Sequence, residues 1–271
     1  MTIDIFNENR EAWDRLVDAG DEWTIPVSSE AISRARSGNW GVLLTPTKSV
    51  PRSWFGELTG ASVLCLACGG GQQAAILAAA GANVTVLDNS PKQLVRDREV
   101  AEREGLAVAC ELGTMTDLSR FADESFDLIF HPVSNLFIPE IQPVWRGASR
   151  VLRTGGRMLA GFANPLIFLF DEDAEDRGKL IVRNTVPYSD LDIYSAEELR
   201  RRVTAGRPIE FGHTLEDQIG GQLEAGFLLA GFYEDGQLGR ALNERTPLFI
   251  ATLALKLPLP DGLEGPLGSI S

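Results

Sequence analysis

The sequence has few of the residues that mark secreted, membrane-spanning or nucleic-acid-binding proteins. Three cysteines cannot form a complete disulfide framework. No apolar run approaches the roughly 20 residues of a membrane span, and the N-terminal MTIDIFNENREAW lacks the basic and apolar segments of a signal peptide. Lys and Arg number 25 against 38 Asp and Glu, a net charge of −13. Because an acidic surface repels phosphate backbones and anionic lipids, we expect a cytoplasmic protein with neither nucleic acid nor membrane as partner.

With 44% hydrophobic residues, the 271-residue chain can bury a sizeable core, and its length predicts one or two domains. Residues 1–60 are predicted to be a helical cap, since Ala12, Leu16 and Val17 recur at helical spacing before Gly20. This extension contains four tryptophans: Trp13, Trp23, Trp40 and Trp54. They are expected either to dock the cap on the rest of the protein or to cover a small apolar ligand.

Beyond residue 60, short apolar runs alternate with helical stretches. Strands are predicted at 63–66, 84–87, 106–110, 126–130, 157–162, 227–233 and 247–257, and helices at 72–80, 91–104, 139–152 and 214–225. Continuous apolar strands separated by helices indicate a parallel sheet covered on both faces. The last two strands are joined by a short connection and should pair antiparallel. The predicted fold is α/β: a doubly wound, seven-stranded, mostly parallel sheet with an antiparallel last strand, plus the N-terminal cap.

The main domain is predicted to span residues 61–271 and to contain an insert on its substrate side. This insert, at about 164–194, is less regular than the rest and is expected to be mobile. Its acidic run, 171–176, is interpreted as a solvated loop, so no metal site is predicted. Tyr188 and Tyr194 are candidate hydroxyl groups for a substrate pocket.

The first predicted strand runs into glycines in VLCLACGGG, residues 63–71. Such a loop lets the backbone approach a ligand closely and points free N–H groups of the next helix toward it. Asp88 ends the next strand, where a carboxylate can accept both hydroxyls of a ribose. Together these features predict a nucleoside-containing cofactor; the alternative is a tight turn with Asp88 as a helix cap. Gly69, Gly71 and Ala74 also fit a nicotinamide-dinucleotide fingerprint, which is weak alone.

These stretches resemble the class I S-adenosylmethionine-dependent methyltransferases, in their small-molecule branch with a ubiquinone-biosynthesis-like methyltransferase domain. The resemblance covers about residues 60–165: VTVLDNSPKQL is similar to the family's second strand and ribose-binding acid, and SFDLIFH and RVLRTGGRMLAGF to its fourth and fifth strands. The final hairpin matches its reversed seventh strand. Three positions depart from the family pattern: Cys65 replaces an acid, Ala67 a glycine, and Thr114 the aspartate beside adenine.

The resemblance implies S-adenosylmethionine as cofactor, S-adenosylhomocysteine as product, and a small-molecule acceptor methylated on O, N, S or C. The cofactor site that it implies consists of Cys68, Gly69, Gly70, Gly71, Gln73, Asp88, Asn89, Ser90, Gln93, Thr114, Met115, Thr116, His131 and Asn135. Two other functions stay open. One is a nicotinamide-dependent oxidoreductase, and the other is a methyltransferase-fold protein that binds the cofactor without methylating. The oligomeric state is not predicted.

The histidines and two of the cysteines each have a catalytic and a structural interpretation. His131 ends the fourth strand and is the candidate general base; alternatively, it holds the loop at residues 134–135 around the cofactor. His213 is expected to cap or pack locally, and its place after the insert leaves a substrate-side role open. Cys65 and Cys68 form a C-x-x-C pair, but without a second pair they are predicted to pack rather than to bind metal.

Overall fold

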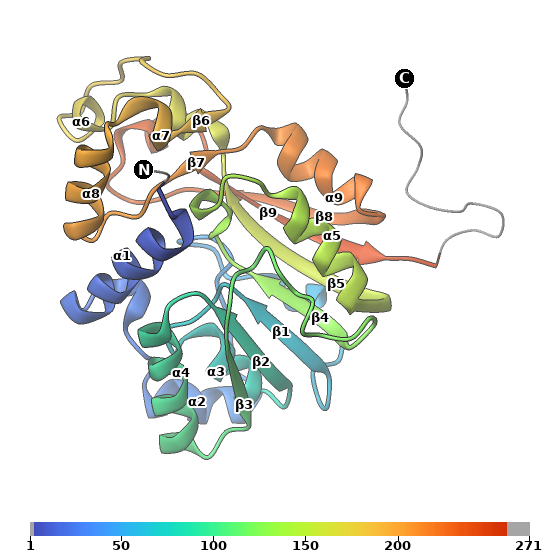
Figure 1. Ribbon diagram of the computed structural model, residues 1–271. Helices are drawn as coiled ribbons and strands as arrows, with labels where there is room; N and C mark the ends of the chain where they lie inside the picture. Colours follow the sequence, from blue (N-terminus) through green and yellow to red (C-terminus); the bar gives the residue numbers. More distant parts are fainter. Residues whose placement is uncertain (1–2, 259–271) are drawn as a thin grey trace.

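The structure, a computed structural model, describes residues 3–258. Its centre is a seven-stranded sheet of order β3-β2-β1-β4-β5-β9-β8, in which β1 to β5 are parallel and β9 is antiparallel to both neighbours (Figure 1). The strands of this sheet are β1 (Ser62–Leu66), β2 (Asn83–Asp88), β3 (Val108–Leu112), β4 (Phe126–His131), β5 (Leu152–Ala163), β8 (Phe227–Asp235) and β9 (Phe249–Lys256). The predicted α/β fold is confirmed.

Nine α-helices lie within the described residues. They are α1 (Ile5–Ala19), α2 (Ser29–Arg36), α3 (Gln73–Ala79), α4 (Pro91–Glu104), α5 (Gln142–Val151), α6 (Glu172–Glu175), α7 (Asp190–Ile193), α8 (Ala196–Thr204) and α9 (Gly221–Glu224). Short 3-10 turns are η1 (Glu22–Thr24), η2 (Arg52–Trp54), η3 (Asn135–Phe137), η4 (Pro165–Leu169) and η6 (Ala241–Glu244), and η5 (Glu216–Gly220) is a π turn.

The predicted helix boundaries follow from local chemistry. Helix α4 begins at Pro91 after Ser90, whose hydroxyl accepts the Gln93 amide at 3.1 Å. It ends at Gly105, which has the left-handed φ of 62° that favours glycine. Gly20 ends α1 in the same way, with φ 70°. These two helix ends can be predicted from the sequence because capping depends only on neighbouring residues.

Both faces of the sheet are buried. Val63 and Cys65 of β1 pack in one apolar cluster with residues of α3 and α4. Leu64 and Leu66 pack in a second cluster with Trp145 and other residues of α5. Because successive strand residues point to opposite faces, this alternation sets the two helical layers on opposite sides of the sheet (Figure 1).

Several elements differ from prediction. Helix α5 begins at Gln142 rather than 139, β8 extends to Asp235 rather than 233, and β9 begins at Phe249 rather than 247. Strand β3 begins at Val108, two residues later than expected. Strand β5 begins at Leu152 and passes through Gly155 and Gly156, because an irregular pairing with β4 lets the glycines stay in the strand. The helix predicted over 214–225 contains the π turn η5.

The segment predicted as a mobile insert carries short, defined elements. Strand β6 (Tyr188–Ser189) pairs antiparallel with β7 (Phe211–Gly212), a second sheet that was not predicted. Phe168 stacks on Tyr188 with ring centroids 5.2 Å apart. In Figure 1 these elements and α6 to α8 gather beside α1, and α1 contacts both α4 and α8.

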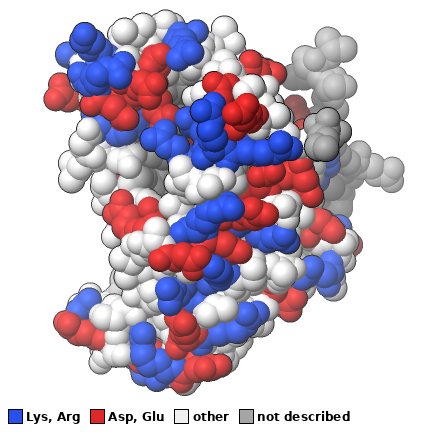
Figure 2. Space-filling view, turned by 60° about the vertical axis from the view of Figure 1, so that its left-hand side comes forward, with Lys and Arg blue, Asp and Glu red and all other residues white. Residues whose placement is uncertain are grey.

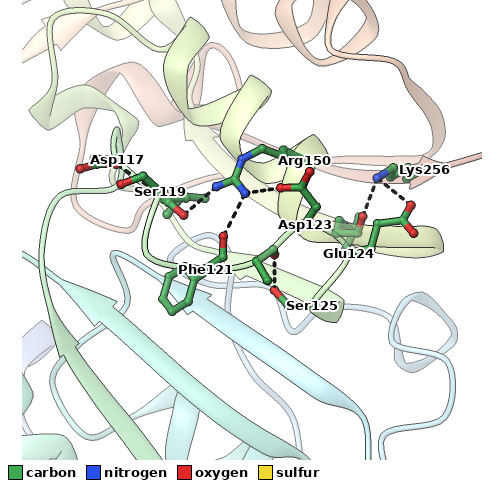
Figure 3. Close-up of polar contacts among 11 residues, drawn as sticks. Asp117, Ser119, Phe121, Asp123, Glu124, Ser125, Arg150 and Lys256 are labelled. Atoms are coloured by element: carbon green, nitrogen blue, oxygen red, sulfur yellow. Dashed lines mark hydrogen bonds and ion pairs between the residues drawn. The ribbon is translucent and has the colours of Figure 1, made fainter.

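A polar network ties the connection between β3 and β4 to α5 (Figure 3). Arg150 donates to the carbonyl oxygens of Leu118 at 2.7 Å and Phe121 at 2.9 Å, and pairs with Asp123. Lys256 of β9 donates to Glu124 at 3.3 Å. The connection is therefore fixed by residues from later elements.

Charges of both signs are interspersed over the face drawn in Figure 2. Over residues 3–258, no helix combines the length and apolarity needed to cross a membrane.

Candidate functional site

A cavity of about 360 Å³ lies at the carboxyl edge of the parallel strands, beneath the N-terminal segment. One part, the β1–β3 half, is bounded by Ala67, Cys68, Gly69, Asp88, Asn89, Gln93, Thr114 and Met115. The other part, the β4–β9 half, is bounded by Pro132, Val133, Ser134, Leu136, Phe137, Ile138, Ile167, Glu210, Gln237, Arg240 and Phe249. The chain order reverses between β1 and β4, the place where open α/β sheets bind ligands.

The amide groups of the glycine loop are bonded to carboxylates of the protein itself. The Gly69 amide donates to Asp88 Oδ2 at 2.9 Å. The Gly70 and Gly71 amides donate to Asp97 Oδ2 and Oδ1, each at 3.1 Å. These three amides are therefore not free to bind a ligand. That free amides of the next helix, α3, point toward the ligand stays a prediction. A dinucleotide pyrophosphate would find two carboxylates here where it needs amide donors.

Asp97 was missed by the sequence analysis. It lies in the middle of α4 and is 1% exposed. Burial, and then the neighbouring Asp88 charge, raise the pKa of Asp97 to about 8, although the two loop amides act in the opposite direction. Its spacing from Leu94 and Val100 places it on the apolar stripe of α4, a signal that was present in the sequence.

The loop glycines are required by close approaches. A Cβ on Gly69 would lie 2.7 Å from Gln93 Cβ and 3.0 Å from Asp88 Cγ. Gly71 has φ +72°, and a Cβ there would lie 2.7 Å from the Arg96 carbonyl oxygen. The glycines thus let α4 pack directly against the end of β1.

Asp88 is held in place on both sides. Its Oδ1 accepts the Ser90 amide at 2.9 Å, while Oδ2 accepts Gly69. Burial raises its pKa, and these backbone bonds act against that rise. The ligand role foreseen for Asp88 is compatible with this geometry, since it lines the cavity. The alternative of a helix cap is wrong, because the N-cap of α4 is Ser90, and the Ser90 amide that Asp88 accepts lies before the helix.

One acceptor in the β1–β3 half lacks a donor. Gln93 is 5% exposed and lines the cavity, and its Oε1 has no hydrogen-bond partner among the described residues. Leaving a buried acceptor unpaired costs about 1–3 kcal/mol. This oxygen has no accessible surface and lies against Gly70, behind the cavity wall. Asp88, Asn89 and Thr114 instead present polar side chains along the lining, so the cavity fits a nucleoside-containing cofactor.

His131 is fully buried and does not line the cavity. Its Nδ1 lies 2.8 Å from the Leu66 carbonyl oxygen, and its Nε2 contacts Asn135 Oδ1. Burial lowers the pKa of His131, and the contacts with Leu66 and Asn135 act in the opposite direction. These contacts favour the structural interpretation of His131, in which it holds the loop after β4, over that of a general base. His213 packs nearby, with Nε2 3.1 Å from the Asn135 carbonyl oxygen.

The N-terminal segment covers the cavity. Phe6, Asn9, Trp13 and Trp23 all line it. The segment is held to the glycine loop by Gln72, whose Nε2 donates to the Glu22 and Ile25 carbonyl oxygens, each at 2.9 Å. Trp13 and Trp23 are therefore placed to cover a ligand, whereas Trp40 and Trp54 pack elsewhere.

These other two tryptophans dock the cap. Trp40 packs edge-on against Phe55 with centroids 5.0 Å apart. Trp54 is buried beside Tyr233 of β8, at 5.4 Å.

Of the predicted cofactor residues, eight line the cavity: Cys68, Gly69, Gln73, Asp88, Asn89, Gln93, Thr114 and Met115. Six lie behind its wall: Gly70, Gly71, Ser90, Thr116, His131 and Asn135. Tyr188 and Tyr194 do not line it either; the Tyr188 hydroxyl donates to Asp190 at 2.7 Å.

The cysteine pair lies in the core. Cys65 and Cys68 are buried and free, and their mutual hydrogen bond, followed by burial, raises the pKa of Cys68 well above its ordinary value. Throughout residues 3–258, no group of three or more His, Cys, Asp or Glu could hold a metal ion.

The acidic run of the insert is not entirely solvated. Glu175 is 6% exposed and accepts hydrogen bonds from Arg240 Nε and the Leu242 amide, each at 3.1 Å. The interpretation of this run as a solvated loop was wrong for Glu175, because the partly buried Arg240 of the β8–β9 connection compensates its charge.

The sheet order, the glycine loop and the acid at the end of β2 define a class I methyltransferase fold. A family model described as "Methyltransferase domain" matches residues 64–160. The chain belongs to the class I S-adenosylmethionine-dependent methyltransferases, and S-adenosylmethionine is its cofactor.

Among individual proteins, the chain is 48% identical over 249 residues to the uncharacterized methyltransferase YbaJ of Bacillus subtilis, covering 92% of this chain and 97% of that protein. A solved S-adenosylmethionine-dependent methyltransferase from Mesorhizobium loti has a TM-score of 0.57 at 20% identity, over 75% of this chain and 94% of that one. The Burkholderia thailandensis 1,6-didemethyltoxoflavin-N1-methyltransferase was solved with 1,6-didemethyltoxoflavin and S-adenosylhomocysteine. It also has a TM-score of 0.57, at 15% identity, over 93% of this chain and 88% of that one.

Proposed function

We propose that the protein transfers the methyl group of S-adenosylmethionine to a small metabolite bound in the β4–β9 half of the cavity. The observation that carries this proposal is the continuity of one cavity from Asp88 to Phe249. The β1–β3 half supplies polar groups suited to a nucleoside, and the β4–β9 half is mainly apolar. A covered, largely apolar cavity with few polar groups is typical of small-molecule sites.

The cofactor would be held by residues of the β1–β3 half. Asp88, which lines the cavity, would accept the ribose hydroxyls. Thr114 and Met115 would contact adenine. His131 would act as a positioning residue, through Asn135 and the loop after β4.

When bound, the cofactor supplies a methyl group on a positively charged sulfur, which is already a good leaving group. The protein's part is therefore to orient the two ligands and to exclude water. Trp13 and Trp23 cover the cavity and perform the second task.

The test is incubation of the protein with S-adenosylmethionine and a low-molecular-weight metabolite extract. Formation of S-adenosylhomocysteine should accompany a new product that carries one extra methyl group, detected by mass spectrometry. The Asp88→Ala variant is the control and should form neither. Tight binding of S-adenosylhomocysteine without any methylated product would instead support the alternative of a non-methylating protein on this scaffold.

A further inference from the structure

Glu210 is the acidic side chain in the β4–β9 half of the cavity. It lies between α8 and β7, in a stretch that carries no recognisable motif. The side chain keeps part of its surface accessible in the cavity. Among residues 3–258, no donor is hydrogen-bonded to its carboxylate.

The backbone of Glu210 is held on both sides. Its amide donates to Asp190 Oδ2 at 2.9 Å, and its carbonyl oxygen accepts the Asp190 amide at 3.0 Å. The preceding residue, Ile209, bonds to the buried side chain of Asn9 through its amide, at 2.7 Å, and its carbonyl oxygen, at 3.0 Å. Four backbone hydrogen bonds therefore fix the position from which the Glu210 side chain enters the cavity.

The charges around Glu210 do not neutralise it. Asp190 of α7 and Glu172 of α6 are like charges, and Arg202 of α8 and Arg240 are the opposing cations. Arg240 is already paired with Glu175. Burial, followed by the Asp190 and Glu172 charges, raises the pKa of Glu210 to about 8.

Most of the rest of this half is apolar, with Leu136, Phe137, Ile167 and Phe249 among its lining residues. Its other polar residues are Ser134, Gln237 and Arg240, the last of which is already paired with Glu175. An unpaired carboxylate in apolar surroundings is stabilised by a ligand that brings a hydrogen-bond donor or a positive charge. An anionic ligand would add a repulsive charge. The half therefore fits a ligand with an apolar body and an N–H or O–H group.

Building on the proposed function, we infer that Glu210 binds the methyl acceptor through its nucleophilic amine or hydroxyl and takes up the proton that this group loses. A lone pair on N or O forms the new bond to the methyl carbon. The bond from that carbon to sulfur breaks, and its electron pair stays on sulfur. The proton of the acceptor goes to a Glu210 oxygen, so charge and atoms balance.

Three aromatic probes of similar size test this inference: benzylamine, benzyl alcohol and benzoate. Their affinities for the protein saturated with S-adenosylhomocysteine are measured by calorimetry at pH 9 and pH 6. The variants are Glu210→Gln and the matched control Glu216→Gln, which changes an exposed glutamate outside the cavity lining. Affinity for S-adenosylhomocysteine is measured first in each protein.

At pH 9 we expect the wild type and the control to bind benzylamine at least tenfold more tightly than benzoate, with benzyl alcohol between them. At pH 6, where the Glu210 carboxyl is protonated, and in Glu210→Gln at either pH, the preference should fall below about twofold. Equal affinities in the wild type, or a preference retained by Glu210→Gln, would overturn the inference. Failure of the wild type to bind S-adenosylhomocysteine would instead contradict the proposed function.

Discussion

The buried carboxyl of Asp97 should make the free energy of unfolding depend on pH. The perturbation is Asp97→Asn, which keeps the shape of the protonated acid and one acceptor for the loop amides. The pKa of Asp97 is raised from its ordinary 3.8 to about 8 in the folded protein. Folding therefore binds a proton between these two values, and the stabilisation present at low pH is lost as pH rises toward 8.

The magnitude follows from the linkage slope. One proton bound on folding changes the free energy of unfolding by about 1.4 kcal/mol per pH unit. Between pH 5 and pH 7, the wild type should lose about 2–3 kcal/mol relative to Asp97→Asn. Above pH 8 the difference should become constant, because both folded and unfolded wild type are then ionised.

The assay is urea unfolding of both proteins at half-unit steps from pH 5 to pH 9. The control is Asp192→Asn, which changes an exposed aspartate of α7. Because it keeps Asp97, its free energy of unfolding should follow that of the wild type at every pH. The free energy of unfolding of the wild type relative to Asp97→Asn should fall between pH 5 and pH 7. If this difference stays constant within about 0.5 kcal/mol, or rises with pH, the assignment of a raised pKa to Asp97 is refuted.

Three further predictions concern the site. Asp88→Asn should weaken S-adenosylhomocysteine binding by about 10–100-fold, since hydrogen bonds to a charged group contribute about 1.5–3 kcal/mol; calorimetry checks this. Gly161→Ala should destabilise the protein by about 1–3 kcal/mol in urea unfolding, because a Cβ would lie 2.2 Å from the Leu44 carbonyl oxygen. His131→Ala should lower S-adenosylhomocysteine affinity together with turnover if His131 positions Asn135, whereas lost turnover with unchanged affinity would identify a base.

The sequence by itself determined the elements whose signals are local. The apolar run at 63–66, the cap at Ser90 and the glycine stops at Gly20 and Gly105 each depend on residues within one or two turns. Together with the acid at Asp88 they predicted the sheet, the cofactor class and most of the β1–β3 half. The sheet and the cofactor class are confirmed, since capping and periodicity act between neighbours along the chain. The individual cofactor-binding residues stay predictions.

Only the tertiary structure decided the other half of the cavity and the true role of the loop amides. Asn9 meets Ile209 across 200 residues of sequence, and this contact holds Glu210 at the cavity wall. The amides of Gly70 and Gly71 are bonded to Asp97 of α4, and α3 and β2 lie between this loop and α4 in the chain. No local pattern encodes such contacts, since they exist only once the cap, the insert and the sheet have packed together.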